Sequence, residues 1–331
     1  MSKTRSFYPL HNSPLHAITS KRRLAKHLGT DEKSLRRLAK QIKSFSPPYH
    51  VFPQKQNGKI RDIENPNLEL KIAQRKFKKL LSRIETPKWL MSGKKSVSIF
   101  NNADFHKHNK VFLCVDIQSF YKSISKDHVK GCFIRKFEMA EDVAGLLSDI
   151  VMFHDKNGVV KNYLPTGAPS SQAIAYWTYH KMFENIHYLA ESRGITMSLY
   201  VDDLTFSSNR SIPVNFIDLL KEKLSKFNLS LKEKKIKRYG AKAYKSVTGC
   251  IITPYNKVKV PNKTRKKILD LTGKDKVEDI EFDRLERLFG SLNSARQIEP
   301  DFFPHVYARV KKQYMKLRPL QKKYQKAKSA H

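Results

Sequence analysis

Two neighbouring carboxylates, Asp202 and Asp203, interrupt the apolar, β-prone run SLYVDDLTF. Leu199 and Val201 precede the pair with strand-like spacing, whereas the next apolar residue, Leu204, is in the opposite phase. A continuous strand would keep its phase, so a break at two polar, turn-tolerant residues predicts a tight hairpin. We therefore expect two carboxylates together at a hairpin tip, where their repulsion costs stability unless a cation or a hydrogen-bond donor compensates it.

A third carboxylate, Asp116, ends the nearly continuous apolar run KVFLCVD, which predicts a buried strand. If this strand lies beside the hairpin, Asp116 comes close to Asp202 and Asp203. Three converging carboxylates suit two hard divalent cations, and two Mg²⁺ ions about 3.5–4 Å apart form the clamp for in-line displacement at phosphorus. The alternative is an ordinary solvated Asp-Asp turn, with Asp116 as a helix cap. These residues alone support the two interpretations equally.

The charge of the chain indicates a polyanionic partner. Its 331 residues carry 65 Lys and Arg against 30 Asp and Glu, a formal net charge of +35. Such a surplus destabilises a compact state unless an anion shares it, so nucleic acid is the leading partner, ahead of an anionic membrane surface. A structural basic protein is also compatible with this composition. Three scattered cysteines, the lack of an apolar run near 18 residues and the polar start MSKTRSFYPL predict a cytoplasmic protein with no membrane partner.

Periodicity and turn signals predict a mixed α+β chain. The expected elements are two short helices in 19–43, a hairpin in 49–63 turning at Asn57-Gly58, a helix in 68–84, a strand in 110–117, a hairpin-like stretch in 156–171 turning at Asn157-Gly158, one long helix in 171–193, a helix in 214–227, a strand-turn-strand in 246–260, and basic helices from Pro261 onward. This order favours an antiparallel sheet backed by helices on one face, of ferredoxin-like type.

Several motifs, in order, resemble a known family. YVDD after an apolar strand, FLCVDIQSFYKSI upstream and LPTGAPSS between them resemble the palm motifs of reverse transcriptases, from about Tyr49 to about Val260. NNADFH resembles the NAxxH motif of retron reverse transcriptases at Asn102 and His106. A second retron motif, VTG, is matched by Val247-Thr248-Gly249.

The resemblance implies that Asp116, Asp202 and Asp203 are the catalytic, metal-binding carboxylates, with two Mg²⁺ ions as cofactors and Mn²⁺ as a possible substitute. It also implies that Tyr121 is the aromatic gate that clashes with a ribose 2′-OH and so favours deoxynucleotides. The alternative for Tyr121 is a half-buried palm aromatic.

Further residues are implied to bind the nucleotide. Gly167 permits close backbone approach, beside a threonine, Thr166, where the family more often has glutamine. Arg61 matches the arginine that grips the triphosphate, although a solvated hairpin charge fits equally well. Lys235 best matches the lysine near the pyrophosphate. Lys234 is a near-equal candidate, and the basic segment around them fits phosphate-backbone contacts equally well.

RNA binding is implied for the retron motifs, at Asn102, His106, Val247, Thr248 and Gly249. It is also implied for the basic tail, including Lys322 and Lys323. Residues 309–331 hold nine Lys or Arg and no acid, which makes a merely solvated helix face a weaker interpretation.

Together the resemblance implies a right-hand polymerase with an antiparallel ferredoxin-like palm sheet, helical fingers and a helical thumb. We expect N-terminal helices and fingers in 1–108, the palm in 109–260 with a fingers insertion around 128–165, and a basic helical thumb in 261–331. The expected function is a bacterial retron reverse transcriptase that uses dNTPs to copy part of its cognate structured noncoding RNA into a branched RNA–DNA (msDNA), with an effector protein in anti-phage defence.

Two alternatives to that function remain. One is another stand-alone or group II intron-like reverse transcriptase primed from a 3′-OH. The other is a catalytically silent RNA-binding scaffold, which the intact acids disfavour because unneeded clustered acids are costly. A two-metal nuclease is a weaker third possibility, because no other residue is seen to position a hydrolytic water.

Overall fold

The structure, a computed structural model, describes residues 7–44, 47–56, 59–95, 97–155, 162–273 and 276–328, without the side chains of Gln56, Lys59 and residues 322–328. These residues form two compact units. Unit 1 comprises Met1–Ser96, Leu113–Phe206 and Ile212–Lys237, and unit 2 comprises Val97–Phe112, Ser207–Ser211 and Arg238–His331. Within the described ranges, none of the helices combines the length and the apolarity needed to cross a bilayer. The three-part division expected from the sequence stays a prediction.

The N-terminal part of unit 1 is a helical layer. The predicted pair of short helices is confirmed as α1 (Lys21–Leu28) and α2 (Glu32–Ile42). The second begins at Glu32, because Asp31 is the N-cap and accepts a 2.8 Å hydrogen bond from the Ser34 N–H. Both helices pack against α6 (Glu141–Val151), which also packs on α5 (Lys126–Arg135).

Two hairpins extend from this layer. The first pairs β1 (Tyr49–Gln56) with β2 (Lys59–Pro66) and leads into α3 (Leu68–Leu81), as predicted. The second pairs the short strands β4 (Phe153–His154) and β5 (Asn162–Tyr163). The turn residues predicted for both hairpins, Asn57-Gly58 and Asn157-Gly158, lie outside the described residues.

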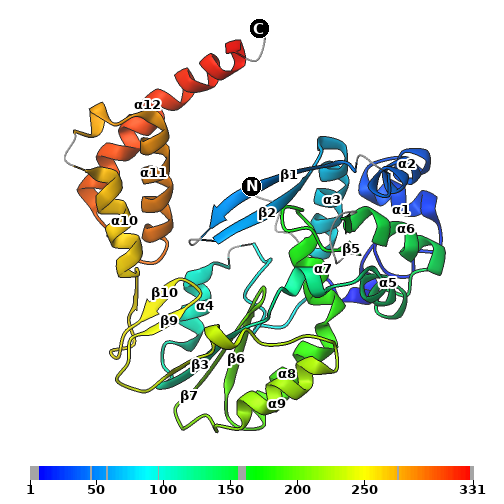
Figure 1. The fold of residues 1–331 in the computed structure, drawn as a ribbon, viewed down its shortest axis with the longest axis horizontal. Helices are drawn as coiled ribbons and strands as arrows, with labels where there is room; N and C mark the ends of the chain where they lie inside the picture. Colours follow the sequence, from blue (N-terminus) through cyan, green and yellow to red (C-terminus); the bar gives the residue numbers. More distant parts are fainter. Residues whose placement is uncertain are drawn as a thin grey trace. The chain divides into compact units, whose positions relative to one another are not determined.

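The central sheet has four strands in the order β6-β7-β3-β8. Their bounds are β6 Thr196–Tyr200, β7 Asp203–Ser208, β3 Val111–Asp116 and β8 Lys237–Tyr239. Helix α8 (His180–Glu191) packs against β6, and α9 (Phe216–Ser225) packs against α8 (Figure 1). This is the mixed helix and antiparallel-sheet architecture expected from the sequence. Short 3₁₀ helices are η1 Leu10–Asn12, η2 Phe120–Ser123, η3 Glu233–Lys235 and η4 Val277–Asp279.

The single long helix predicted for 171–193 is wrong, because the structure has two helices there. Helix α7 (Ser171–Thr178) ends at Tyr179, whose backbone has φ −111° and ψ 20°, and α8 begins at the next residue. The Tyr179 side chain is buried, and its hydroxyl lies 3.0 Å from His128 Nδ1. The helix break thus depends on tertiary packing around Tyr179, which the periodicity of the sequence does not indicate.

Unit 2 joins a small sheet to a helical bundle. Strands β9 (Lys245–Val247), β10 (Cys250–Ile252) and β11 (Val258–Lys259) form a sheet in the order β11-β10-β9, one strand more than predicted, and α4 (Ile99–His106) packs on it. The bundle consists of α10 (Asn262–Thr272), α11 (Phe282–Arg296) and α12 (Pro304–Lys328). Glu299 ties the two parts, since it accepts hydrogen bonds from the Val260 N–H, Lys259 and Arg265.

Phe206 is a test of the unit 1 core. It is fully buried in β7 and meets Phe216 of α9 edge-to-face at 5.1 Å between ring centroids. We expect Phe206→Ala to lower the free energy of unfolding by about 3–5 kcal/mol, because a large cavity replaces these contacts. Urea denaturation followed by tryptophan fluorescence measures unit 1 specifically, since Trp89 and Trp177 both lie in it.

The matched control is Tyr188→Ala on α8, whose side chain is 72% exposed. This change should alter the free energy by less than about 0.5 kcal/mol. Equal losses in the two variants would contradict the assignment of Phe206 to the core.

Candidate active site

The turn between β6 and β7 is built from Val201 and Asp202, while Asp203 opens β7. Only one of the two acids therefore lies in the turn itself. Val201 has φ +62°, a strained conformation for a β-branched residue, which persists only where the surroundings hold it. They do so here: the Val201 N–H donates to Ser92 Oγ at 3.0 Å, and the Asp202 carbonyl accepts from the Ile117 N–H at 3.0 Å.

Three carboxylates converge at this turn. Strand β7 lies beside β3, which ends at Asp116, so the acid from far upstream meets Asp202 and Asp203. One carboxylate oxygen from each lies within 4.8 Å of the others, a spacing that can hold a metal ion. Asp116 is only 5% exposed and the other two are half-buried. The convergence expected from the sequence is thus present.

The electrostatics of the cluster favour a bound cation. Burial, with the charges of Asp202 and Asp116, raises the pKa of Asp203 above its ordinary value. Burial and Asp116 likewise raise the pKa of Asp202, against the opposing charges of Lys235 and Arg61. The Lys235 ammonium is ion-paired with Asp116. One paired lysine does not balance three acids, so the residues fit hard divalent cations such as Mg²⁺.

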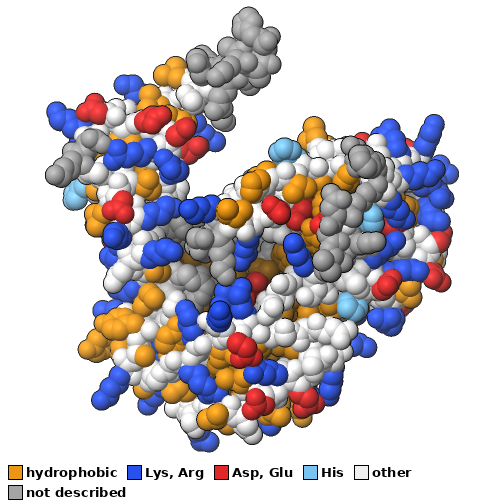
Figure 2. All heavy atoms as spheres, in the orientation of Figure 1, with side chains coloured by type: hydrophobic (Ala, Val, Ile, Leu, Met, Phe, Trp, Pro, Cys, Tyr) orange, Lys and Arg blue, Asp and Glu red, His pale blue; other side chains and the backbone are white. Residues whose placement is uncertain are grey.

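A pocket of about 480 Å³ adjoins the carboxylates. Its lining comes from five parts of unit 1: Ile60, Arg61 and Asp62; Asp116, Ile117, Ser119, Phe120, Tyr121 and Lys122; Thr166; Val201 and Asp202; and Lys232. The structure therefore brings the predicted Arg61 and Tyr121 to the acids, and Lys235 reaches them through its ion pair. Lys and Arg side chains are also spread over the face of the molecule seen in Figure 2.

Tyr121 is a half-buried aromatic that lines the pocket, and its role as a gate stays a prediction. Its ring is half-buried, 6.1 Å from that of Phe120, and it also faces the pocket. Burial and the charge of Asp202 raise the pKa of its hydroxyl, so the side chain stays neutral near pH 7. A neutral ring of this size at the pocket wall can exclude a substituent without repelling the phosphates.

The loop that carries Gly167 meets strand β2 at a residue that the sequence reasoning missed. A Cβ at Gly167 would lie 2.6 Å from the carbonyl oxygen of Glu64, so only glycine fits there. The Glu64 side chain is 1% exposed and accepts hydrogen bonds from the same loop. No hydrophobic pattern or motif marks a buried acid in a strand, and only the tertiary contacts reveal it.

The two retron-like motifs meet inside unit 2. Asn102 is fully buried, and its Nδ2 donates to Thr248 Oγ1 at 3.1 Å. Thr248 (φ 43°) and Gly249 (φ 89°) form the two-residue turn between β9 and β10, as two positive φ angles allow. His106 Nδ1 lies 2.6 Å from Ser207 Oγ, and burial lowers the pKa of His106 to about 3, so its imidazole is neutral.

This burial changes how the motifs could serve RNA binding. Asn102, His106 and Val247 are inside the unit, Thr248 is partly covered, and Gly249 is exposed. RNA binding at these five residues stays a prediction; within unit 2 the three buried side chains support the turn, and Gly249 is the residue that is exposed. Lys322 and Lys323 lie outside the described side chains, so RNA binding by the tail stays a prediction.

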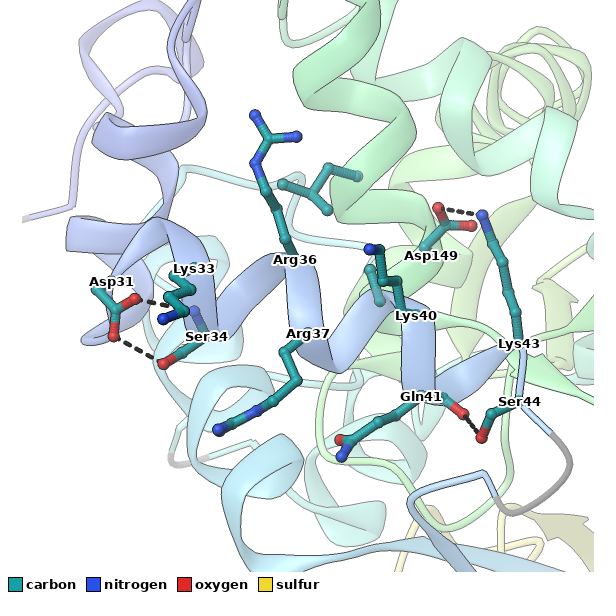
Figure 3. A pocket seen from close by; sticks show the side chains of 12 residues that line it. Asp31, Lys33, Ser34, Arg36, Arg37, Lys40, Gln41, Lys43, Ser44 and Asp149 are labelled. Carbon is teal, nitrogen blue, oxygen red and sulfur yellow. Dashed lines mark hydrogen bonds and ion pairs between the residues drawn. The ribbon is translucent and has the colours of Figure 1, made fainter.

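A larger groove of about 1000 Å³ lies along α2 (Figure 3). Its cations are mostly engaged: Arg36 pairs with Glu32, Arg37 with Glu69 and Lys43 with Asp149. Figure 3 also shows Asp31 turned back onto Ser34 as the helix cap. These pairs stabilise the helical layer, and no cluster of acids accompanies them among the described residues.

Buried carboxylates that fit divalent cations, in a pocket with arginine and lysine side chains, define a site for chemistry on phosphate groups. A sequence profile of the family described as reverse transcriptase (RNA-dependent DNA polymerase) matches residues 53–268. The chain belongs to this family.

Within this family, the chain is similar to known retron reverse transcriptases. The chain is 28% identical to the Retron Se72 reverse transcriptase of Salmonella heidelberg over 68% of its own length and 58% of that protein. It is 28% identical to the Retron Ec86 reverse transcriptase of Escherichia coli (62% of the chain, 63% of that protein) and 32% identical to the Retron Mx162 enzyme of Myxococcus xanthus (58% and 42%). The aligned region spans less than two thirds of each of these relatives. The predicted resemblance to retron-type reverse transcriptases is confirmed.

Cation binding at the acid cluster is testable by stability. We expect Mg²⁺ to raise the free energy of unfolding of the wild-type protein by about 2.7 kcal/mol at roughly 100 times its Kd, because it binds only the folded cluster. The raised pKa values of Asp202 and Asp203 mean that, without cation, these acids lower stability as the pH rises through them, so the gain should be larger at pH 8 than at pH 5.

Chemical denaturation with Mg²⁺ or with EDTA measures this effect. Asp203→Asn should abolish the gain, whereas Asp218→Asn, an exposed acid on α9, should keep it. A gain of equal size in Asp203→Asn would place the cation elsewhere.

The Asn102–Thr248 contact lies in unit 2, which has no tryptophan, and is testable by urea denaturation followed by far-UV circular dichroism. Asn102→Ala should lower the free energy of unfolding by about 1–3 kcal/mol, because it removes the hydrogen bond to Thr248 in a buried setting. His108→Ala, an exposed neighbour, is the control and should be neutral. A loss of RNA affinity in Asn102→Ala with unchanged stability would instead favour direct RNA contact.

Proposed function

We propose that the chain is the RNA-directed DNA polymerase of a retron. The observation that carries the proposal is the cluster of Asp116, Asp202 and Asp203 at one end of the pocket that Arg61 and Tyr121 line. The family and the retron relatives support it, since each of those relatives is named a reverse transcriptase. The surplus of cations supports a nucleic-acid partner.

In this proposal each group has one task. Asp116, Asp202 and Asp203 hold two Mg²⁺ ions, or Mn²⁺ in their place, which when bound supply the electrostatic stabilisation of nucleotidyl transfer. Arg61 binds the triphosphate of a dNTP, for which its planar fork is suited.

The remaining pocket residues position the sugar and the leaving group. Tyr121 lies where bulk at the sugar 2′ position would collide with its ring. Lys235 exchanges its ion pair with Asp116 for the leaving pyrophosphate, to which it donates a proton. Gly167 allows the nucleotide to approach the backbone of its loop.

The proposed template, product and biological role are those expected of a retron reverse transcriptase. The template is a cognate structured noncoding RNA, part of which is copied into a branched RNA–DNA (msDNA) in the cytoplasm. An effector protein uses the product in anti-phage defence. Residues 1–108 then supply the N-terminal helices and fingers, 109–260 the palm, and the basic helices in 261–331 a thumb that holds phosphates.

The acids are the first test. Asp202→Asn and Asp203→Asn should lower single-dNTP incorporation on an RNA template with an annealed primer by at least about 100-fold, because cation binding is lost. RNA affinity should change by less than about twofold, since removal of one half-buried negative charge leaves the cationic surface intact. Asp218→Asn is the control and should match the wild type in both assays.

Undiminished incorporation in either acid variant would overturn the site. The retron claim is tested with the same proteins purified from the native host with their nucleic acid. The wild type should carry a DNA joined to RNA that a debranching enzyme releases, and Asp202→Asn should carry RNA alone. Linear DNA in the wild type would indicate the 3′-OH-primed class instead.

A further inference from the structure

Glu64 is a buried acid in strand β2 that binds the segment 163–167, which starts at the last residue of strand β5 and continues as a loop. It is 1% exposed, although Arg61 and Asp62 on the same strand are exposed. Its Oε2 accepts a 2.7 Å hydrogen bond from the Thr166 N–H. Its Oε1 accepts a 3.1 Å hydrogen bond from the Tyr163 hydroxyl. Both carboxylate oxygens therefore bind the same loop.

The loop is also held from its other side. The Leu164 N–H donates to the carbonyl of Tyr121 at 3.3 Å. Ser171 Oγ donates to the carbonyl of Pro165 at 2.7 Å. The residues from Tyr163 to Thr166 thus connect strand β2, through Glu64, to the backbone of the aromatic residue at the pocket wall.

Backbone contact fixes the spacing at this junction. The Cβ that Gly167 lacks would lie 2.6 Å from the Glu64 carbonyl oxygen and 2.9 Å from Ile63 Cγ2. Strand and loop therefore touch without an intervening side chain. Arg61, three residues before Glu64, and Thr166 both line the pocket. A shift of the loop against the strand changes the distance between the Arg61 and Tyr121 sides of the pocket.

Packing alone does not explain an acid at position 64. An acid at 1% exposure is costly, and among the described residues no lysine or arginine forms an ion pair with it. An apolar side chain would fill the volume more cheaply but would leave the Thr166 N–H without its acceptor. The carboxylate meets the two donors with two separate oxygens, whereas an apolar side chain has no acceptor and a hydroxyl side chain has only one oxygen.

We propose that Glu64 is a positioning residue that holds strand β2 and the loop at 163–167 in register and thereby sets the discrimination between deoxyribonucleoside and ribonucleoside triphosphates. The inference rests on the proposed polymerase function. With the link intact, a triphosphate at Arg61 places its sugar at a fixed distance from Tyr121. Without the link the two walls move independently, so dNTP binding weakens and the 2′-OH is excluded less strictly.

The experiment compares Glu64→Ala, Glu64→Gln and the control Glu69→Ala, an exposed acid on α3 that pairs with Arg37. Steady-state incorporation of a single dNTP and of the matching rNTP is measured on an RNA template. Glu64→Ala should raise the KM for dNTP by roughly tenfold, with kcat within about threefold, and lower the dNTP/rNTP ratio of kcat/KM roughly tenfold.

The other variants sharpen the comparison. Glu64→Gln should stay within about threefold of the wild type, because its amide oxygen accepts from the Thr166 N–H and its NH₂ donates to the Tyr163 oxygen. Glu69→Ala should match the wild type. The nucleotide ratio does not depend on the fraction of folded enzyme, so a merely structural role would lower kcat and leave KM and the ratio unchanged. That result would overturn the inference.

A second readout separates this inference from the proposed function. Hydrogen exchange of the Thr166 amide should be about tenfold faster in Glu64→Ala than in the wild type or in Glu69→Ala. Unchanged exchange would overturn the link itself. Absence of dNTP incorporation in the wild type would overturn the polymerase proposal, while the exchange rates would still decide whether Glu64 holds the loop.

Discussion

The repulsion among three carboxylates is the constraint on which the centre of unit 1 depends. Asp116 ends β3, and the turn from β6 to β7 brings Asp202 and Asp203 to it, with ligand oxygens within 4.8 Å. Burial and mutual charge raise the pKa values of the last two, so the cluster costs stability when empty. The surroundings hold it together: Ser92 and Ile117 bind the strained turn, and Lys235 pairs with Asp116. A destabilising cluster of acids at one end of a sheet is typical of a site that binds a cation.

Around the cluster, function depends on how separate segments are held in register. The pocket takes its walls from a hairpin strand, the segment after β3, a loop after β5 and the turn itself. Gly167 permits strand and loop to touch, and Glu64 binds the loop through both of its oxygens. The α2 groove is larger but lacks this organisation, because three of its cations, Arg36, Arg37 and Lys43, are paired with nearby acids. Concavity alone is therefore a poorer guide to the site than the convergence of charged groups from distant segments.

Unit 2 shows that motif residues can be buried inside the fold. The stretches resembling NAxxH and VTG are 146 residues apart at the Asn102–Thr248 hydrogen bond, yet they form one contact. That contact holds a threonine at φ 43° and so presents the turn with Gly249 outward. A neutral, buried His106 beside Ser207 braces the same region. The motifs indicate family membership. They do not tell which of their side chains contact a partner and which only support the contacting ones.

The sequence by itself determined the secondary structure in outline, the three acids, and the pocket positions Arg61 and Tyr121, because periodicity, turn chemistry and family motifs are local signals. It also predicted the hairpins β1–β2 and β4–β5, although it merged α7 and α8 and placed both acids in one turn. Only the tertiary structure decided the break at Tyr179, the burial of Asn102 and His106, the choice of Lys235 over Lys234 at Asp116, and the role open to Glu64. Each of these depends on which distant segment lies opposite a residue. Burial and hydrogen-bond partners are properties of such pairs of segments, and no single stretch of sequence contains them.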